Sequence, residues 1–270
     1  MDKGAPLTGR ATHEQSPDGL GHSVGVPSAD KIIGGRARLI LGDCRAVWGH
    51  LPAQVTHVIT DPPYGANETH AAHLSTVQLG DDTPERQALG FAGITEAELG
   101  ELASQWCEKA ERWVVFSCEW KHAHSLPNLV RLGIWRKPDS APQFTGDRPG
   151  MGWEAVAICH RPGRKKWNGG GKHAVWTVGY QTDPDLFKHT GAKHPTQKPV
   201  PLLKQWIADF TDLEDVILDP FMGSGTTGVA AVQMGRKFIG IERDPHWFDV
   251  ACRRIEQAQR QGDLFIEVAA

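Results

Sequence analysis

Short apolar runs alternate along the chain with longer segments in which apolar residues recur at helical spacing. Runs of about 4–8 apolar residues are typical of buried strands, and a period near 3.6 residues is typical of helices. The runs predict strands at residues 37–44, 56–60, 113–117, 154–159, 215–218 and 237–241. The periodic segments predict helices at residues 95–112, 119–132, 199–210, from the turn at 219–228 to 234, and 245–261. This alternation predicts a doubly wound, mostly parallel α/β sheet.

Stretches without periodicity divide the chain into regions. Residues 1–34 are rich in glycine, proline and small polar residues, which predicts a mobile tail ahead of one α/β domain at residues 35–270. Residues 66–94 are polar and predict a flexible surface loop. Residues of about 139–190 have little periodicity and predict an insertion that projects from the sheet.

The composition excludes several classes of protein. With 270 residues, 40% hydrophobic and 23% charged, the chain is unlike disordered, collagenous or coiled-coil sequences. It has no apolar run of about 18 residues, so we expect no transmembrane helix, and its start lacks the apolar core of a signal peptide. The five cysteines are scattered and form no CxxC pair, which predicts a reducing, cytoplasmic location and no metal site.

Charge is distributed unevenly along the chain. The formal net charge is −3, yet residues 161–204 contain nine basic and two acidic residues. That segment therefore carries +7, which leaves −10 on the rest of the chain. A basic segment on an acidic body suits a polyanion such as nucleic acid, but a solvated loop would have the same composition.

A glycine-rich turn lies between a predicted strand and a predicted helix. Gly223, Gly225 and Gly228 fit the pattern G-x-G-x-x-G, and Glu242 ends the next strand 19 residues after Gly223. Such a turn admits the backbone of a nucleotide ligand, and the acid can bind a ribose diol. No lysine follows the glycines, so the turn is not a Walker A loop. The pattern alone is also compatible with a tight structural turn, and it does not separate NAD from S-adenosylmethionine.

A second unusual loop, Asp61-Pro62-Pro63-Tyr64, follows another predicted strand. The amino group of adenine or cytosine is a poor nucleophile because its lone pair is delocalised into the ring. A carboxylate from Asp61 and the carbonyl of Pro62 could accept its two N–H bonds, and the proline rings would hold these acceptors rigidly. Tyr64 offers a flat face for stacking on the base. The alternative is a rigid turn with an exposed aspartate.

Four motifs together resemble one family. They are Leu41-Gly-Asp43-Cys44, Asp61-Pro-Pro-Tyr64, His194-Pro-Thr-Gln-Lys198-Pro199 and Asp219-Pro-Phe-Met-Gly-Ser-Gly225. In this order they resemble the amino-directed (N6-adenine or N4-cytosine) DNA methyltransferases of the β-group. The specific resemblance covers about residues 36–65 and 190–255. It implies the Rossmann-like fold of S-adenosylmethionine-dependent methyltransferases.

The resemblance implies roles for individual residues. Asp61, Pro62, Pro63 and Tyr64 would form the catalytic target-base site. At the cofactor, the resemblance implies that Asp219 holds the methionine amino group and that Glu242 binds the ribose. It implies that the pocket is shaped by Phe221, Gly223 and Gly225. It also implies that the cofactor adenine lies by Asp43 and Cys44, and the cofactor carboxylate near Thr196 and Lys198.

The implied reaction is methyl transfer from S-adenosylmethionine to N6 of an adenine flipped out of duplex DNA. The aspartate that begins the tetrad favours adenine N6 as the target, and cytosine N4 is the alternative. More distant alternatives are an NAD-dependent oxidoreductase, a non-catalytic DNA-binding module, and an enzyme of this kind that acts on RNA. Residues 66–94 would close over the target base, residues 139–190 would recognise DNA, and a homodimer is compatible with the resemblance. The residues expected to bind DNA are Arg164, Lys165, Lys166, Trp167 and Lys172, with Trp176 as a further stacking candidate.

Overall fold

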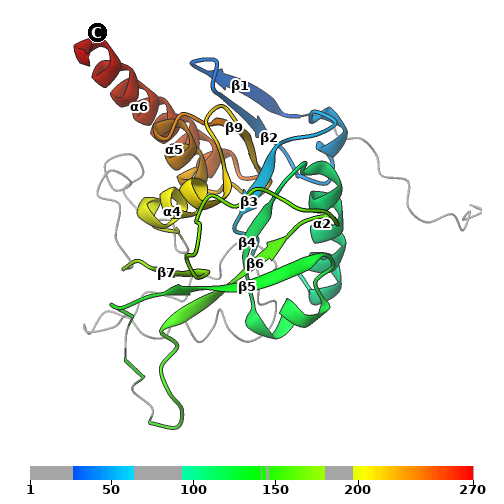
Figure 1. The fold of residues 1–270 in the computed structure, drawn as a ribbon. Coiled ribbons are helices and arrows are strands. Elements are labelled where there is room, and N and C mark those ends of the chain that lie inside the picture. Colours follow the sequence, from blue (N-terminus) through cyan, green and yellow to red (C-terminus); the bar gives the residue numbers. More distant parts are fainter. Residues whose placement is uncertain (1–26, 64–92, 141, 144–145, 180–196, 270) are drawn as a thin grey trace, which may run out of the picture.

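The computed structural model describes residues 27–63, 93–140, 142–143, 146–179 and 197–269, with only the backbone described after residue 261. All strands in this part of the chain form one nine-stranded sheet, in the order β1-β2-β9-β8-β3-β4-β6-β5-β7 (Figure 1). The strands are β1 Ala29–Ile33, β2 Ala37–Leu41, β3 His57–Thr60, β4 Val114–Cys118, β5 Leu129–Arg136, β6 Trp153–Cys159, β7 Val175–Thr177, β8 Val216–Asp219 and β9 Lys237–Glu242. The helices are η1 Trp48–His50, α2 Glu96–Lys109, η3 Trp120–Ser125, α4 Val200–Phe210, α5 Thr226–Gln233 and α6 Pro245–Ala269.

Strand direction gives the sheet two chemically different edges. Strands β2, β9, β8, β3 and β4 are parallel, so their carboxyl ends share one edge, here called the carboxyl edge; the opposite one is the amino edge. Strand β6 runs antiparallel to β4, with Ala155 opposite Cys118 and Cys159 opposite Val114. The start of β6 therefore lies at the carboxyl edge, and the chain leaves β6 at the amino edge.

Helices cover both faces of the sheet and build two hydrophobic cores. Helices α4, α5 and α6 pack on one face, where Trp206, Phe210 and Ile255 join the inward side chains of the strands. Helix α2 packs on the other face through Leu102 and Trp106. A doubly wound, mostly parallel sheet is confirmed, and in such sheets ligands bind at the carboxyl ends of the strands.

Most elements follow the sequence prediction, but the helix expected at residues 119–132 is wrong. The chain there forms the short 3₁₀ helix η3 and then strand β5. Pro127 cannot donate a helical hydrogen bond, and Asn128 has a left-handed φ of 59°. The following residues, Leu129–Arg136, pair with β6, and this long-range pairing overrides the local helical pattern.

Three boundaries also differ from the prediction. Strand β1 lies inside the range predicted as a mobile tail and pairs with β2 in an antiparallel ladder, Ala29 opposite Leu41. Part of the insertion predicted to project from the sheet instead supplies β7, the edge strand next to β5. The last helix extends to Ala269, beyond the predicted end near residue 261.

A membrane span is not seen among the described helices, none of which combines the necessary length and apolar character.

Candidate active site

The loop after β3 places Asp61, Pro62 and Pro63 at the carboxyl edge. The Pro63 carbonyl accepts a hydrogen bond from the Ile94 backbone N–H at 2.8 Å, which ties this loop to the segment before α2. Asp61 Oδ2 lies 2.8 Å from Lys198 Nζ. Asp61 Oδ1 is buried and has no hydrogen-bond partner among the described residues. The fourth member of the motif, Tyr64, lies outside the described residues.

The charge state of Asp61 depends on opposing influences. Burial raises the pKa of Asp61, the positive charge of Lys198 lowers it, and the negative charge of Glu154 raises it again. Desolvation is the largest of these influences, so the pKa of Asp61 lies above its ordinary value. Lys198 supplies the positive charge that favours the anion, which is the form able to accept hydrogen bonds from an amino group.

Lys198 belongs to a larger cluster of charged groups. Its Nζ also lies 3.2 Å from Glu154 Oε2, and the other oxygen of Glu154 binds Lys137. Both ammonium groups lie over the buried indole of Trp135, Lys137 at 4.5 Å and Lys198 at 5.8 Å from the ring centroid. The sequence argument placed Lys198 near the cofactor carboxylate; in the structure its described contacts are with Asp61, Glu154 and Trp135.

Strand β8 delivers Asp219 to the same edge. Its Oδ1 accepts hydrogen bonds from Thr60 Oγ1 at 2.6 Å and from the Phe221 N–H at 3.0 Å. Burial raises the pKa of Asp219 to about 6, against the effect of these hydrogen bonds. Because Thr60 immediately precedes Asp61, this contact fixes the target-base loop to the glycine-rich turn.

The glycine-rich turn has the geometry that the sequence predicted. Gly223 and Gly225 have left-handed φ angles of 50° and 81°, which residues with a side chain rarely adopt. A Cβ at Gly225 would lie 2.9 Å from the Cβ of Ala251, so glycine is also required by packing against α6. Arg254 supports the turn from α6 by donating to the Ser224 carbonyl at 2.6 Å.

Glu242 closes the other side of this turn. Its Oε2 accepts the Gly223 N–H at 2.9 Å and its Oε1 accepts the Asp244 N–H at 2.8 Å. Each carboxylate oxygen has a further lone pair, which is what binding of a diol requires. Burial raises the pKa of Glu242, while these backbone hydrogen bonds lower it. The Gly42 N–H bonds to the Glu242 carbonyl at 2.9 Å, which brings the end of β2 beside the turn.

The loop after β2 holds Asp43 and Cys44 next to Glu242. Asp43 Oδ1 accepts the Arg45 N–H at 2.8 Å, a local turn contact. Cys44 is buried, and burial together with the charge of Asp43 raises the pKa of its thiol to about 12. Cys44 therefore stays protonated at neutral pH and acts as a packing residue rather than a nucleophile. Phe221 packs edge-on against Trp106, with ring centroids 6.1 Å apart.

These features fit S-adenosylmethionine. The left-handed glycines lie at the start of α5, and the Glu242 carboxylate lies beside them, which is the arrangement of a glycine-rich turn and an acid that binds a nucleoside ligand in this class of fold. The unpartnered Asp61 Oδ1 lies on the adjoining loop. Of the predicted cofactor residues, the structure gathers Asp43, Cys44, Asp219, Phe221, Gly223, Gly225 and Glu242 at the carboxyl edge, whereas Thr196 lies outside the described residues.

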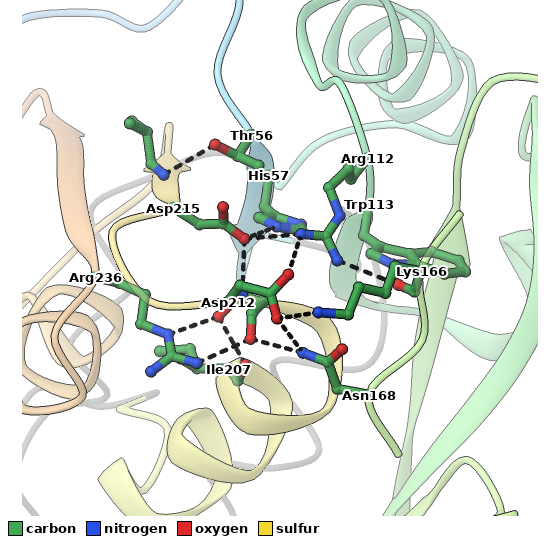
Figure 2. Close-up of polar contacts among 12 residues, drawn as sticks. Thr56, His57, Arg112, Trp113, Lys166, Asn168, Ile207, Asp212, Asp215 and Arg236 are labelled. Carbon is green, nitrogen blue, oxygen red and sulfur yellow. Dashed lines mark hydrogen bonds and ion pairs between the residues drawn. The ribbon is translucent and has the colours of Figure 1, made fainter. Parts of the chain in front are cut away.

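The residues predicted to bind DNA lie elsewhere. The segment that contains Arg164, Lys165, Lys166, Trp167 and Lys172 follows β6 and so begins at the amino edge. Figure 2 shows Lys166 in this region, where its Nζ pairs with Asp212 at 2.7 Å. The structure therefore does not bring this segment to the target-base loop. Binding of DNA by these residues stays a prediction.

Two of the aromatic candidates in that segment serve the core. Trp176 is 0% exposed, and its indole N–H bonds to Asp209 at 2.8 Å, so the prediction that it could stack on a base is wrong. Trp167 is half-buried and packs edge-on against Phe210 at a centroid distance of 4.9 Å. Lys172 pairs with Asp209 at 2.7 Å.

Sequence reasoning missed three residues of the site. None of the three belongs to a motif, and their contacts form only in the folded chain. Thr60 bonds to Asp219, Glu154 pairs with Lys198, and Lys137 pairs with Glu154. One signal was available: Glu154 is the only charged residue in an otherwise apolar predicted strand, residues 154–159. A charge at the end of a buried strand needs a partner and often marks a site.

Comparisons with known proteins agree with the fold and the motifs. Residues 127–253 match the family model described as DNA methylase. The chain is 27% identical over 255 residues to the Type II methyltransferase M.HinfI of Haemophilus influenzae, a match that covers 81% of this chain and 68% of that protein. It is 46% identical over 140 residues to the Type II methyltransferase M2.MboI of Moraxella bovis, covering 48% of this chain and 50% of that protein.

Solved structures show the same fold. The M1.HpyAVI–SAM complex is similar with a TM-score of 0.58 and 23% identity, covering 81% of this chain and 99% of that one. The cytosine-N4-specific PvuII DNA methyltransferase is similar with a TM-score of 0.62 and 16% identity, covering 84% of this chain and 92% of that one. The family model over residues 127–253 and the two relatives support assignment of this chain to the amino-directed DNA methyltransferases, a family that uses S-adenosylmethionine to methylate N6 of adenine or N4 of cytosine.

Proposed function

We propose that this chain transfers a methyl group from S-adenosylmethionine to N6 of adenine in double-stranded DNA, as the modification enzyme of a type II restriction–modification system. Two relatives named Type II methyltransferases support the second part of this proposal. The aspartate that begins the tetrad supports adenine, because the resemblance described above associates Asp at this position with N6 methylation. Cytosine N4 is the alternative base, since it presents the same pair of N–H donors.

The observation that carries the proposal is the unpartnered oxygen of Asp61. Oδ1 is buried without a hydrogen bond among the described residues, while Oδ2 is bound to Lys198. A buried acceptor without a donor is costly, on the order of 1–3 kcal/mol, unless a ligand satisfies it. An exocyclic amino group would supply the missing donor.

The chain's own residues can raise the nucleophilicity of that amino group. Asp61 Oδ1 would accept one N–H, and the carbonyl of Pro62 would accept the other. Because both acceptors are fixed by the proline-rich loop, they would draw the nitrogen lone pair out of conjugation without reorganising. The anionic Asp61 also stabilises the positive charge that develops on the nitrogen as it is alkylated. Tyr64 would stack on the flipped base.

S-adenosylmethionine supplies an electrophilic methyl group on a sulfonium sulfur. Glu242 and the turn Gly223–Gly225 would bind its nucleoside part, and Asp219 its methionine amino group. The contact between Thr60 and Asp219 joins the two halves of the site through the residue next to Asp61. Holding both reactants on adjoining loops replaces a bimolecular encounter by an oriented one, which can supply about 7–11 kcal/mol of the barrier reduction.

Nucleoside mass spectrometry of host DNA tests the proposal. A host without adenine or cytosine amino methylation would express the wild-type chain or its Asp61→Ala variant. We expect N6-methyladenine with the wild type and none with the variant. N4-methylcytosine instead would keep the enzyme class and reject the assigned base. Absence of any modified base, from soluble protein that binds S-adenosylmethionine, would reject this chain as a DNA methyltransferase acting alone.

A further inference from the structure

The ammonium group of Lys198 is shared between two carboxylates. Its Nζ lies 2.8 Å from Asp61 Oδ2 and 3.2 Å from Glu154 Oε2. The Lys198 side chain is only 9% exposed, and those of Asp61 and Glu154 are 25% and 21% exposed. At these exposures ion pairs are weakly screened by solvent, so the division of one positive charge between two acids affects both.

Glu154 is held in place by more than Lys198. Its other oxygen, Oε1, binds Lys137, so that Glu154 bridges two lysines that would otherwise repel each other. Both lysines lie over the face of Trp135. Trp135 is itself buried, and its indole N–H is fixed by the Val178 carbonyl at 2.9 Å. The position of Lys198 is therefore defined by Asp61, by Glu154 and by an immobile aromatic face.

This arrangement decides which part of Asp61 is available. Lys198 contacts Oδ2, and Oδ1 is buried without a hydrogen bond among the described residues. The Ser117 hydroxyl on β4 is likewise buried without a partner, and it lies near enough to Asp61 to lower the pKa of that carboxyl group. If Asp61 were the only acid near Lys198, the ammonium group would be free to move toward the middle of the carboxylate and draw on both oxygens. The attraction of Glu154 Oε2, 3.2 Å from the same Nζ, would oppose that movement.

We propose that Glu154 is a positioning residue for methyl transfer, sharing Lys198 with Asp61 so that Oδ1 stays open to accept an N–H of the target amino group. The inference rests on the proposed function, because it assigns Asp61 the role of acceptor. It goes beyond that function by giving a part in turnover to Glu154, which belongs to none of the four motifs.

The inference makes a specific claim about pH dependence. Among the described residues, the charged groups that act on Asp61 are Lys198, Glu154 and, across the turn, Asp219. The negative charge of Glu154 raises the pKa of Asp61, and that of Lys198 lowers it. Neutralising Glu154 removes a negative charge that competes with Asp61 for Lys198, and this lowers the Asp61 pKa. The acid limb of the rate profile should move to lower pH while turnover falls, because the lysine now draws on the oxygen that the substrate needs.

The test uses the purified full chain, radiolabelled S-adenosylmethionine and unmethylated genomic DNA. The variants are Glu154→Gln, Glu154→Asp and a control, Glu256→Gln, in which the same change is made on α6 at a carboxylate paired with Arg260. We expect Glu154→Gln to lower kcat about tenfold or more, to leave the Kd for S-adenosylmethionine within about twofold, and to shift the acid limb of kcat/KM downward. Glu154→Asp keeps the charge and should retain the wild-type acid limb with part of the lost kcat restored. The control should match the wild type.

Three results would overturn the inference. One is a Glu154→Gln enzyme with wild-type kcat and acid limb. Another is an acid limb that moves to higher pH, which would mean that Lys198 leaves Asp61 when Glu154 is neutral. The third is a loss of activity that follows a loss of cofactor binding with the acid limb unchanged, as a purely structural role would give. The position of the limb does not depend on how much protein folds. An inactive wild type would instead overturn the proposed function, and this inference with it.

Discussion

The two edges of the sheet each hold a cluster of charged side chains, and the clusters differ in how completely they are satisfied. At the carboxyl edge Lys198 binds Asp61 through one oxygen and leaves the other without a donor. At the amino edge, Asp215 Oδ2 alone is bonded to His57 at 2.9 Å, Arg112 at 3.0 Å and the Asp212 N–H at 2.8 Å (Figure 2). Both clusters cross between strands that are far apart in the chain. Each keeps one buried atom without a hydrogen bond among the described residues, Asp61 Oδ1 at the carboxyl edge and His57 Nδ1 at the amino edge, but only at the carboxyl edge is that atom a carboxylate oxygen.

In the amino-edge cluster, burial and hydrogen bonds together set the ionisation states of His57 and Asp215. Burial lowers the pKa of His57, so the imidazole is neutral at physiological pH and its Nε2–H can donate to Asp215. Burial alone would raise the pKa of Asp215, but the bonds from His57 and from the backbone of Asp212 hold it below its ordinary value. Arg112 adds ion pairs to both acids. A cluster in which each charge has an opposite partner stabilises the fold, whereas one that leaves a carboxylate oxygen open can accept a hydrogen bond from a substrate.

The sharpest test of this contrast replaces Asp61 by asparagine. Asp61→Asn keeps the shape of the side chain but removes the charge that accepts from the amino group and stabilises its developing positive charge. We expect kcat to fall about 10²–10³-fold, as for the loss of one preorganised electrostatic contact. The melting temperature should change little, because Lys198 keeps Glu154 as a partner. Single-turnover methylation and thermal unfolding measure the two quantities; a large loss of stability would contradict the contrast.

The converse test removes the centre of the amino-edge cluster. Asp215→Ala leaves Arg112 and His57 without their shared acceptor in a partly buried region. Breaking a buried pair in this way costs about 3–5 kcal/mol of unfolding free energy. Urea unfolding should show this loss. Active-site titration with S-adenosylmethionine should show kcat per folded molecule within about twofold of the wild type, and a greater fall in kcat would mean that the two edges are coupled.

Asp219 lies at the carboxyl edge, in the candidate active site, but it is buried and hydrogen-bonded like the acids of the amino-edge cluster. Burial raises its pKa to about 6, well above the value of an unfolded chain, so the folded state holds a proton that the unfolded state has lost between about pH 4 and 6. Its contribution to stability therefore falls as pH rises through that window and stays lost above it. Asp219→Asn should be more stable than the wild type at pH 8, by up to about 3 kcal/mol, and the advantage should shrink by about 1 kcal/mol at pH 5.

The same variant should bind S-adenosylmethionine more weakly, because the proposed partner of the methionine amino group loses its charge. Thermal unfolding at pH 5 and pH 8, with and without the cofactor, measures both effects. Thr60→Ser is a suitable control and should behave like the wild type in both measurements, since it keeps the hydroxyl that bonds to Asp219. A stability difference that does not change with pH would show that Asp219 is ionised throughout.

The sequence could predict the carboxyl edge in outline because its motifs are continuous. Asp61 to Pro63 and Asp219 to Gly225 each follow a predicted strand, and parallel strands bring such loops to one edge. It could not predict that Lys198 contacts Asp61, 137 residues away, since nothing local fixes where a flexible lysine points. Nor could it find the role of Glu154, because that depends on β6 running antiparallel to β4, with Ala155 opposite Cys118.

The amino edge escaped prediction for a related reason. His57, Arg112 and Asp215 are spread over 158 residues and carry no motif, so their association is a consequence of strand order alone. The basic segment predicted to bind nucleic acid begins at this edge, and two of its lysines pair with Asp209 and Asp212. Counting charges along the sequence could not reveal that these lysines are partly neutralised by acids at the end of α4.

The smallest expected effect is on the salt dependence of DNA binding, which should differ between basic residues of that segment with and without an ion pair. Both side chains are exposed, but Lys166 pairs with Asp212, whereas no ion pair is seen for Arg164 among the described residues. Each lysine or arginine that contacts a phosphate adds about 0.9 to the slope of log K against log salt concentration for duplex DNA. We expect Arg164→Gln to lower this slope by nearly that amount, and Lys166→Gln to change it by less than half as much and to cost at most about 1 kcal/mol of stability. Fluorescence anisotropy at several salt concentrations measures the slopes. Equal slopes for both variants and the wild type would mean that neither Arg164 nor Lys166 contacts a DNA phosphate.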